Sequence, residues 1–394
     1  MRKIVKYASY LLFLPIWYIV KLIPRKQDVW VFGAWYGNRY ADNSKALFEH
    51  VVEYRKELTA IWLTRNRNVV NELKSNGYRC YHVHSLKGIY YSLICGYYLV
   101  SSGKRDVNYL FTNGAKAVQL WHGSPIKKIS LDDPSSNYSS LFYKIFKHVF
   151  PFVYEFNYDL ILANSELFAG IMMSAFGMKR DSVLVTGCPR NDYYFSPKTE
   201  QIITSTNQRF NNPKLLIYLP TFRENRSLDE LFKNFAFETS EFTDYLEYSN
   251  SVLFVKPHYV DRSALMGMFS NEERIIVLSD NEIEDLNLLV KDCDVLLTDY
   301  SSIFFDFLLT EKPIIFTAFD FKEYVSVSRE LYFDYQDLVP GPITENWAAV
   351  RKEIDKLENR DDYAKLRTEK KKVFNTYSDS KNCNRVLEAL LAQE

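Results

Sequence analysis

The sequence lacks an excess of charge of either sign. Its 394 residues carry 49 Lys and Arg against 49 Asp and Glu, so no global field favours nucleic acid as a partner. The five cysteines form no CxxC pair, which argues against a zinc site of that type and fits a reducing compartment. Because carboxylates do not cluster with the histidines, we predict neither a metal site nor a cofactor.

Two nucleotide-binding signatures are also missing. No GxGxxG follows the first predicted strand, and no GxxxxGK[ST] occurs in the chain. The absence of both signatures therefore argues against a nicotinamide-dependent enzyme and against a P-loop enzyme. A third missing feature is a signal peptide, because no small-residue cleavage site follows the apolar stretch near the start.

The first 26 residues contain no apolar run long enough to span a bilayer. The run over residues 7–20 is shorter than the ~20 residues that a spanning helix needs, and Pro15 interrupts it. Lysine and arginine flank it on both sides. We expect segment 1–26 to be a helix in the membrane interface, with Trp17 and Tyr18 among the lipid headgroups. The alternative is a helix packed on the protein.

Aromatic residues are abundant, with 29 Tyr and 28 Phe, which suits either a large core or contacts with a membrane surface. They are dense in segment 135–160, which also carries Lys144 and Lys147. This composition is typical of a basic amphipathic helix that binds anionic lipid. A helix packed on the sheet remains the alternative. The lipid-binding helix expected over 135–160 and the interface helix expected over 1–26 together predict a peripheral protein on the cytoplasmic face of the cell membrane.

From residue 27 onward, short apolar runs alternate with segments of helical periodicity. This alternation predicts the α/β class, with parallel sheets covered by helices on both faces. The polar stretch that begins at residue 195 interrupts the pattern and reads as a linker. We therefore predict two Rossmann-like doubly wound domains facing a cleft, at 27–194 and 195–394, with ligands at the carboxyl ends of the strands.

The segment AVQLWHGSPIKK (117–128) places an imidazole directly after an apolar run. With an unperturbed pKa near 6.5, His122 suits a general base at neutral pH. Gly123 would let a substrate approach the backbone, and the Ser124 hydroxyl lies beside it. The alternative for His122 is a structural turn residue. Lys127 and Lys128 would meet an anionic acceptor, a lipid headgroup or water.

Further polar clusters follow predicted strands in the second half. Arg223 in LPTFREN has the planar fork that binds phosphates, although a loop arginine is commonly a surface residue. In LLTDYSS, hydroxyls and free N–H groups at a helix start would bind an anion. Plain structural roles compete with each assignment. The remaining candidates in these clusters are Lys256, His258, Asp299, Ser301 and Ser302.

Several of these segments resemble the CDP-glycerol glycerophosphotransferases, the primases and polymerases of teichoic acid synthesis in bacterial cell walls and capsules. The resemblance covers residues 30–345. It rests on WYGNRYADNSK (35–45), WHGSPIKKIS (121–130), ANSELFAGIMMSAFG (163–177), VTGCPRND (185–192), LIYLPTFREN (216–225), VLFVKPH (252–258), DLNLLVKDCDVLLTDYSSIFFDFLLTEKPIIFTAFDFKEY (285–324) and VPGPI (339–343). Each tetrapeptide is weak alone, and the set is specific in combination. Ser124 stands where the family motif usually has Thr, and Ser130 where it usually has Gly.

The resemblance implies a two-Rossmann fold of the GT-B glycosyltransferase type and transfer of glycerol phosphate from CDP-glycerol to a lipid-linked acceptor, with release of CMP. It implies His122 as the base and His258 as a second catalytic histidine. Arg223, His258, Ser301 and Ser302 would bind the diphosphate and the leaving group, and Asp299, Asn43 and Ser44 are weaker substrate-binding assignments. Two alternatives stay open, a CDP-ribitol donor and a GT-B glycosyltransferase that uses a sugar nucleotide. The acceptor, the polymer length and the oligomeric state are not implied.

Overall fold

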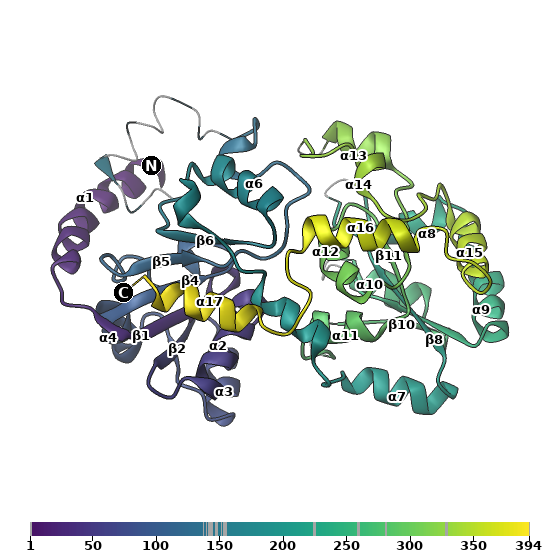
Figure 1. Cartoon of the computed structure of the whole chain (residues 1–394), viewed down its shortest axis with the longest axis horizontal. Helices are drawn as coiled ribbons and strands as arrows, with labels where there is room; N and C mark the ends of the chain where they lie inside the picture. The colour runs from purple at the N-terminus through teal and green to yellow at the C-terminus, as the bar shows by residue number, and fades with distance from the viewer. Residues whose placement is uncertain are drawn as a thin grey trace. The chain divides into compact units, whose positions relative to one another are not determined.

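A computed structural model provides the fold of the chain (Figure 1). The residues that the structure describes are 2–136, 138, 140, 145, 149–150, 152, 156–223, 226–257, 261–279, 282–327 and 330–393, with backbone only for 2–9 and 327. They divide into two compact units. The first unit comprises Met1–His122, Ile129–Asp192 and Lys381–Glu394, and the second comprises Gly123–Lys128 and Tyr193–Ser380.

Within the described residues, the strands of the first unit form one seven-stranded parallel sheet in the order β3-β2-β1-β4-β5-β6-β7. Its central strands are buried along most of their length, as expected for a parallel sheet covered on both faces. The strands are β1 (Lys26–Gly33), β2 (Thr59–Thr64), β3 (Cys80–His82), β4 (Cys95–Val100), β5 (Lys116–Gln119), β6 (Leu160–Ala163) and β7 (Val183–Val185).

Helices and short 3-10 turns connect these strands. The α-helices are α1 (Arg2–Lys21), α2 (Asp42–Tyr54), α3 (Arg67–Ser75), α4 (Leu86–Ile94), α6 (Glu166–Phe176) and α17 (Asn382–Leu391). The 3-10 helices are η1 (Trp35–Gly37), η2 (Lys104–Asp106), η3 (Ser130–Asp132), η6 (Arg180–Ser182) and η7 (Pro189–Phe195).

The second unit holds a five-stranded parallel sheet, counted over its described residues, in the order β10-β9-β8-β11-β12. Its strands are β8 (Lys214–Leu219), β9 (Ser251–Val255), β10 (Ile275–Val277), β11 (Val295–Thr298) and β12 (Ile314–Phe316). The helices are α7 (Gln201–Phe210), α8 (Leu228–Lys233), α9 (Thr239–Tyr248), α10 (Arg262–Met268), α11 (Leu286–Asp292), α12 (Ile303–Phe307), η8 (Leu308–Thr310), α13 (Phe321–Val327), α14 (Tyr335–Leu338), α15 (Trp347–Lys356) and α16 (Ala364–Phe374).

An aromatic cluster fills the core on one face of this second sheet. Trp347 stacks on Phe232 with ring centroids 4.8 Å apart, and Tyr218 of β8 meets Trp347 edge-on at 5.0 Å. The indole nitrogen of Trp347 donates to the Leu231 carbonyl at 3.0 Å, so its polar atom is satisfied inside the core. Much of the unusual aromatic content thus lies in the interior.

The C-terminal helix belongs to the first unit, whereas the sequence pattern placed residues up to 394 in the second domain. The Asp192 carboxylate accepts from the backbone N–H groups of Asn382 and Cys383 at 2.8 and 2.9 Å, and so caps the start of α17. Near its other end, the Tyr97 hydroxyl of β4 donates to the Leu390 carbonyl. The periodicity of the sequence does not indicate that the end of the chain returns to the first unit.

One side of α1 packs on the first unit, and the other side is exposed. Val20 is buried, the Trp17 ring lies 5.9 Å from that of Phe152, and Asn113 donates to the Trp17 carbonyl at 2.7 Å. Among the described residues, no helix has the length and apolarity required to cross a bilayer. Trp17 was expected among lipid headgroups, but its 8% exposure places it against the protein.

Candidate active site

The candidate site residues of the first unit follow three neighbouring strands. β1, β4 and β5 lie side by side, and they lead into Trp35, Ser101 and His122 respectively. Because the carboxyl ends of parallel strands share one edge of the sheet, residues distant in sequence meet there. The rings of Trp35 and His122 have centroids 6.1 Å apart.

The protonation pattern of the His122 ring is set by one hydrogen bond. Its Nδ1 lies 2.9 Å from the carbonyl oxygen of Ser101. A carbonyl only accepts, so Nδ1 carries the hydrogen and, in the neutral ring, the lone pair resides on Nε2. This tautomer presents Nε2 as the basic atom, which is what a general base requires.

Burial shifts His122 towards the neutral form. Desolvation lowers the pKa of His122 below its ordinary value, while the negative charge of Asp42 and the bond to Ser101 raise it and the charge of Arg190 lowers it. The net direction is downward. The ring is therefore mostly neutral at pH 7 and able to accept a proton.

The turn that carries the Ser101 carbonyl is organised by the buried Asp106. One carboxylate oxygen accepts from the N–H groups of Ser101, Ser102 and Gly103, and the other accepts from Tyr36 at 2.6 Å. Burial raises the pKa of Asp106 to about 6, although these backbone donors lower it. Asp106 thus joins the ends of β1 and β4.

Asn43 and Ser44 make hydrogen bonds within the first unit. Both are fully buried in the first turn of α2. The Asn43 amide donates to the carbonyls of Leu120 and Trp121 at 3.0 and 2.9 Å, and the Ser44 hydroxyl lies 2.6 Å from that of Ser101. Their polar groups hold the strand ends together, and their assignment to substrate binding stays a prediction.

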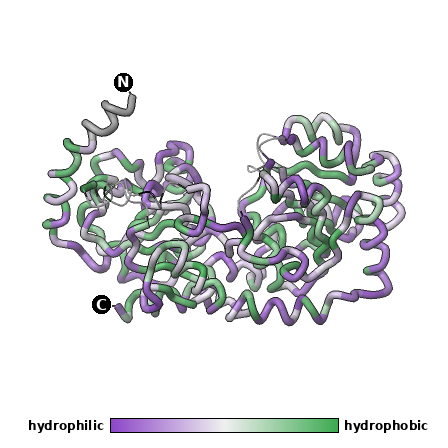
Figure 2. Tube along the Cα trace, turned by 90° about the horizontal axis from the view of Figure 1, so that it is seen from above, coloured by the Kyte–Doolittle hydropathy of each residue, from purple (hydrophilic) through white to green (hydrophobic). Residues whose placement is uncertain are grey.

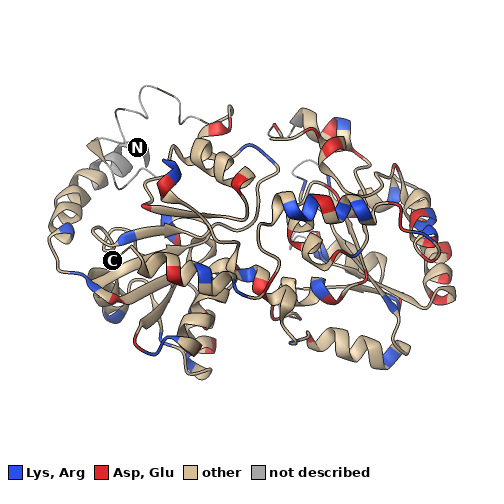
Figure 3. Cartoon of the chain, in the orientation of Figure 1, with Lys and Arg blue, Asp and Glu red and all other residues tan. Residues whose placement is uncertain are grey.

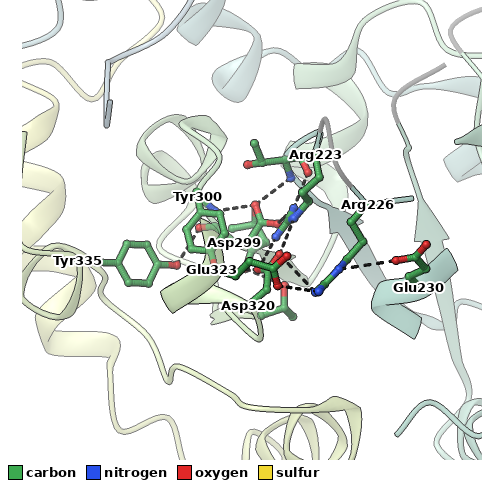
Figure 4. Close-up of polar contacts among 11 residues, drawn as sticks. Arg223, Arg226, Glu230, Asp299, Tyr300, Asp320, Glu323 and Tyr335 are labelled. Atoms are coloured by element: carbon green, nitrogen blue, oxygen red, sulfur yellow. Dashed lines mark hydrogen bonds and ion pairs between the residues drawn. The ribbon is translucent and has the colours of Figure 1, made fainter. Parts of the chain in front are cut away.

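In the second unit, Arg223 lies at the centre of a buried ionic network (Figure 4). Its side chain is 7% exposed. Nε and Nη2 donate to the two carboxylate oxygens of Asp320 at 3.0 and 2.9 Å, and Nη1 donates to Asp299 at 2.5 Å. Asp299 is fully buried and also accepts from the backbone of Thr221 and Tyr300. Both side chains thus have internal partners, and their direct contact with substrate stays a prediction.

Two stacked tyrosines adjoin the network. Tyr300 and Tyr324 have ring centroids 3.8 Å apart, and the Tyr300 hydroxyl donates to Asp320 at 2.9 Å. The guanidinium carbon of Arg223 lies 5.3 and 5.4 Å from these two ring centres. The Tyr335 hydroxyl donates to the Asp299 carbonyl at 2.9 Å. Asp320, Tyr324 and Tyr335 were not among the predicted site residues, although Asp320 and Tyr324 lie in the segment 285–324 that resembles the family.

The segment Gly123–Lys128 belongs to the second unit. The Lys128 N–H donates to the Glu330 carbonyl at 2.7 Å, and the Tyr332 N–H donates to Ile126 at 2.8 Å. The Lys127 ammonium lies 4.7 Å from the Tyr324 ring centre, and that of Lys128 pairs with Glu330 at 2.6 Å. Both lysines therefore have partners within the second unit, and their contact with an acceptor or a lipid headgroup stays a prediction.

Gly123 and Ser124 are both buried. Gly123 has φ +131°, a backbone conformation that favours glycine, so its role includes the shape of the turn after the base. Their assignment to substrate contact stays a prediction.

The other predicted residues of the second unit follow adjacent strands. Lys256 is half-buried after β9, and Ser301 and Ser302 are half-buried after β11, next to the short helix α12. Since β9, β8 and β11 are neighbours, these side chains share one sheet edge with Arg223. His258 lies outside the described residues, as do Lys144 and Lys147 of segment 135–160.

A pocket lies at the sheet edge that Arg223 occupies. It is lined by Thr221, Phe222, Arg223, Arg226 and Asp261 with Pro220 and Leu228.

Residues 16–392 match the family described as CDP-Glycerol:Poly(glycerophosphate) glycerophosphotransferase. This chain belongs to that family. The match spans both units and all the strand-end residues discussed above.

Named relatives agree along nearly the whole chain. A teichoic acid glycerol-phosphate transferase of Staphylococcus aureus is 27% identical over 95% of this chain and 93% of its own length. A teichoic acid poly(glycerol phosphate) polymerase of Bacillus spizizenii is 26% identical over 90% and 91%. A ribitol-phosphate polymerase of S. aureus, TarK, is 28% identical but aligns with only 52% of this chain. The extent of the matches favours glycerol over ribitol phosphate.

Solved structures confirm the fold class. Two structures of the wall teichoic acid polymerase TagF match with TM-scores of 0.76 and 0.77, at 21% and 22% identity, over 100% of this chain and 97% of theirs. A co-structure of S. aureus MnaA with UDP matches more distantly, with a TM-score of 0.57 and 15% identity over 93% of this chain and 96% of that one. The predicted α/β architecture with two parallel sheets is therefore confirmed.

Proposed function

We propose that this protein transfers glycerol phosphate from CDP-glycerol to a hydroxyl of a membrane-linked acceptor in cell-surface polymer synthesis. The observation that carries the proposal is the His122 tautomer, with Nδ1 bound to the Ser101 carbonyl and the lone pair on Nε2, in a member of the glycerophosphotransferase family. Nε2 takes the proton of the acceptor hydroxyl, and the hydroxyl oxygen attacks the β-phosphorus. The bond between that phosphorus and the bridging oxygen breaks, and CMP leaves.

The donor is CDP-glycerol rather than CDP-ribitol or a sugar nucleotide. The family description and a TagF structure soaked with CDPG support this choice. Parallel assays with CDP-glycerol, CDP-ribitol and a UDP-sugar test it. Release of CMP from CDP-glycerol alone is expected, whereas faster turnover of CDP-ribitol, or binding of UDP but not CDP in a thermal shift, would reverse it.

Lys256, Ser301, Ser302 and the pocket beside Thr221 would hold the donor diphosphate, with His258 as the second catalytic histidine. Arg223 supports this region from within through Asp299 and Asp320. Asp299 accepts from the N–H groups of Thr221 and Tyr300, so the ion pair sets the loops that follow β8 and β11. A loop edge whose shape is fixed in this way suits an anionic ligand better than a flexible arginine would.

The enzyme works at the cytoplasmic face of the cell membrane as a peripheral protein. The outer side of α1 and the adjoining Leu22 support this step, because they expose large apolar side chains. These are Leu12 (74%), Leu22 (81%), Leu11, Tyr18 and Ile19. Beyond residue 9 the helix carries a single charged residue, Lys21, and its turns are mostly tan in Figure 3 and partly green in Figure 2. An apolar helix face with aromatic and basic neighbours suits the lipid interface.

A further inference from the structure

Arg190, which lies outside the predicted site, binds the backbone of His122 and forms a buried ion pair with Asp42. Arg190 comes from η7, where its Nη1 donates to the carbonyl oxygen of His122 at 2.9 Å and also to Asp42 at the start of α2. Both side chains of this ion pair are 8% exposed. Taking two charges out of water is costly, and apolar side chains would fill a purely structural position at lower cost. The pair therefore calls for another role.

The peptide groups on both sides of the imidazole are held in place. The Trp121 carbonyl accepts from the Asn43 side-chain amide at 2.9 Å, and the Asn43 Oδ1 atom accepts from the backbone N–H of Arg190 at 3.0 Å. The His122 carbonyl accepts from the Arg190 guanidinium. Asn43 and Arg190 thus link the first turn of α2 to the turn that carries the base.

Backbone strain marks the same place. Asp42 has φ +64° and Trp121 has φ +58°, although neither is a glycine. Such conformations are costly and persist only where the surroundings over-determine them, typically at functional sites. Here the surroundings are the indole of Trp35, which donates to Asp42 at 2.6 Å, and the Arg190 guanidinium on the other carboxylate oxygen.

We propose that the buried Asp42–Arg190 pair positions His122 by holding its carbonyl group, and sets the charge environment in which the imidazole accepts a proton. The proposal rests on the function given above, in which His122 is the base. Asp42 and Arg190 are positioning residues, because they act on the reaction through His122.

The charges that face the ring make opposite contributions. Asp42 raises the pKa of His122 and Arg190 lowers it, while the contacts from the other elements are the neutral rings of Trp35 and Trp121 and the Ser101 carbonyl. Burial also raises the pKa of Asp106, which holds the Ser101 turn, to about 6. Neutralising Asp42 should therefore lower the His122 pKa, and neutralising Arg190 should raise it. Loss of packing alone predicts no such opposition.

The test compares Asp42→Asn with Arg190→Gln, which remove charge at nearly constant size. Nitrogen NMR of histidine-labelled protein follows the imidazole nitrogens, and the His122 signals are those lost in His122→Gln. In the wild type, Nδ1 should carry the proton of the neutral ring. The His122 pKa should fall in Asp42→Asn and rise in Arg190→Gln, each by about half a unit or more, and the double variant should lie between them. The acidic limb of the pH profile of kcat/KM should move likewise.

Shifts of the same sign, or unchanged titration in folded variants, would overturn the proposal. In Asp42→Asn, the new NH2 group faces a donor, either the Trp35 indole or the Arg190 guanidinium. The double variant Trp35→Phe/Asp42→Asn removes the indole donor and so avoids this clash. Its reference is Trp35→Phe alone. The NMR titration observes His122 directly and so separates it from Asp106. It needs no substrate, so its outcome does not depend on CDP-glycerol being the donor.

Discussion

Arg223 and Asp320 form a two-point contact, with Nε and Nη2 of the guanidinium 3.0 and 2.9 Å from the two carboxylate oxygens. Nη1 is occupied by Asp299 and the Thr221 carbonyl. Burial raises the pKa of Asp320, but the bonds and charge of Arg223 outweigh it and hold that pKa below its ordinary value. An arginine that its position marked as a phosphate ligand is therefore the central cation of an internal network.

Arg223→Ala should destabilise the second unit strongly. The substitution leaves Asp299 and Asp320 buried without their shared cation, which costs about 3–5 kcal/mol. Chemical denaturation followed by tryptophan fluorescence measures the loss. Lys233→Ala is the matched control, because its exposed pair with Asp229 is worth ~0–1 kcal/mol. Equal stabilities of the two variants, with a higher KM for CDP-glycerol in Arg223→Ala, would restore direct donor binding.

The rate should depend on pH through His122. Because burial lowers the pKa of His122, the ring loses its proton below its ordinary titration range as pH rises. The kcat/KM value should thus rise through an acidic limb centred below pH ~6.5 and be flat above it. His122→Ala should lower the rate about 10²–10⁴-fold and abolish that limb. A limb centred above pH 7 would be inconsistent with a buried neutral base.

Gly123→Ala should impair turnover more than its size suggests. With φ at +131°, an alanine is strained there and shifts the turn that follows the base. We expect a reduced kcat with little change in the KM for CDP-glycerol. Gly170→Ala is the control, because nothing lies within 4 Å of a Cβ at that position. If both variants turned over at the wild-type rate, the backbone shape at residue 123 would have no part in catalysis.

Membrane binding should depend on the outer face of α1. Leu12→Glu/Leu22→Glu removes two exposed apolar side chains and adds negative charge, so we expect weaker sedimentation with vesicles of phosphatidylglycerol. Leu86→Glu on α4 is the control, because Leu86 is 88% exposed on another helix. Unchanged sedimentation of the double variant would exclude the α1 face as the membrane-binding surface and leave segment 135–160 as the candidate.

Much of the fold was predictable because strand and helix periodicities are strong in this chain. The rule that ligands gather at the carboxyl ends of strands directed attention to His122, Arg223 and Asp299, and each of them follows a strand of a parallel sheet. The pattern could not reveal which partner each side chain contacts. Arg223 and Asp299 turn to each other, a choice that depends on Asp320 almost a hundred residues away.

Long-range partners explain the other misses. Asp42 and Arg190 are 148 residues apart in sequence, and neither has a neighbour that signals an ion pair. The same holds for Asp192, which caps α17 and brings the chain end into the first unit. The motifs ADNSK and CPRND supplied the only hint, because both belong to the set that resembled the family.

The most direct test of the central claim is a CMP-release assay with CDP-glycerol and a lipid-linked saccharide acceptor, run on the wild type and on His122→Gln. CMP should appear only with acceptor present, in an amount equal to the glycerol phosphate incorporated, and the variant should be slower by about 10²-fold or more. Absence of CMP from CDP-glycerol across a range of acceptors, or equal rates for the two proteins, would contradict the account.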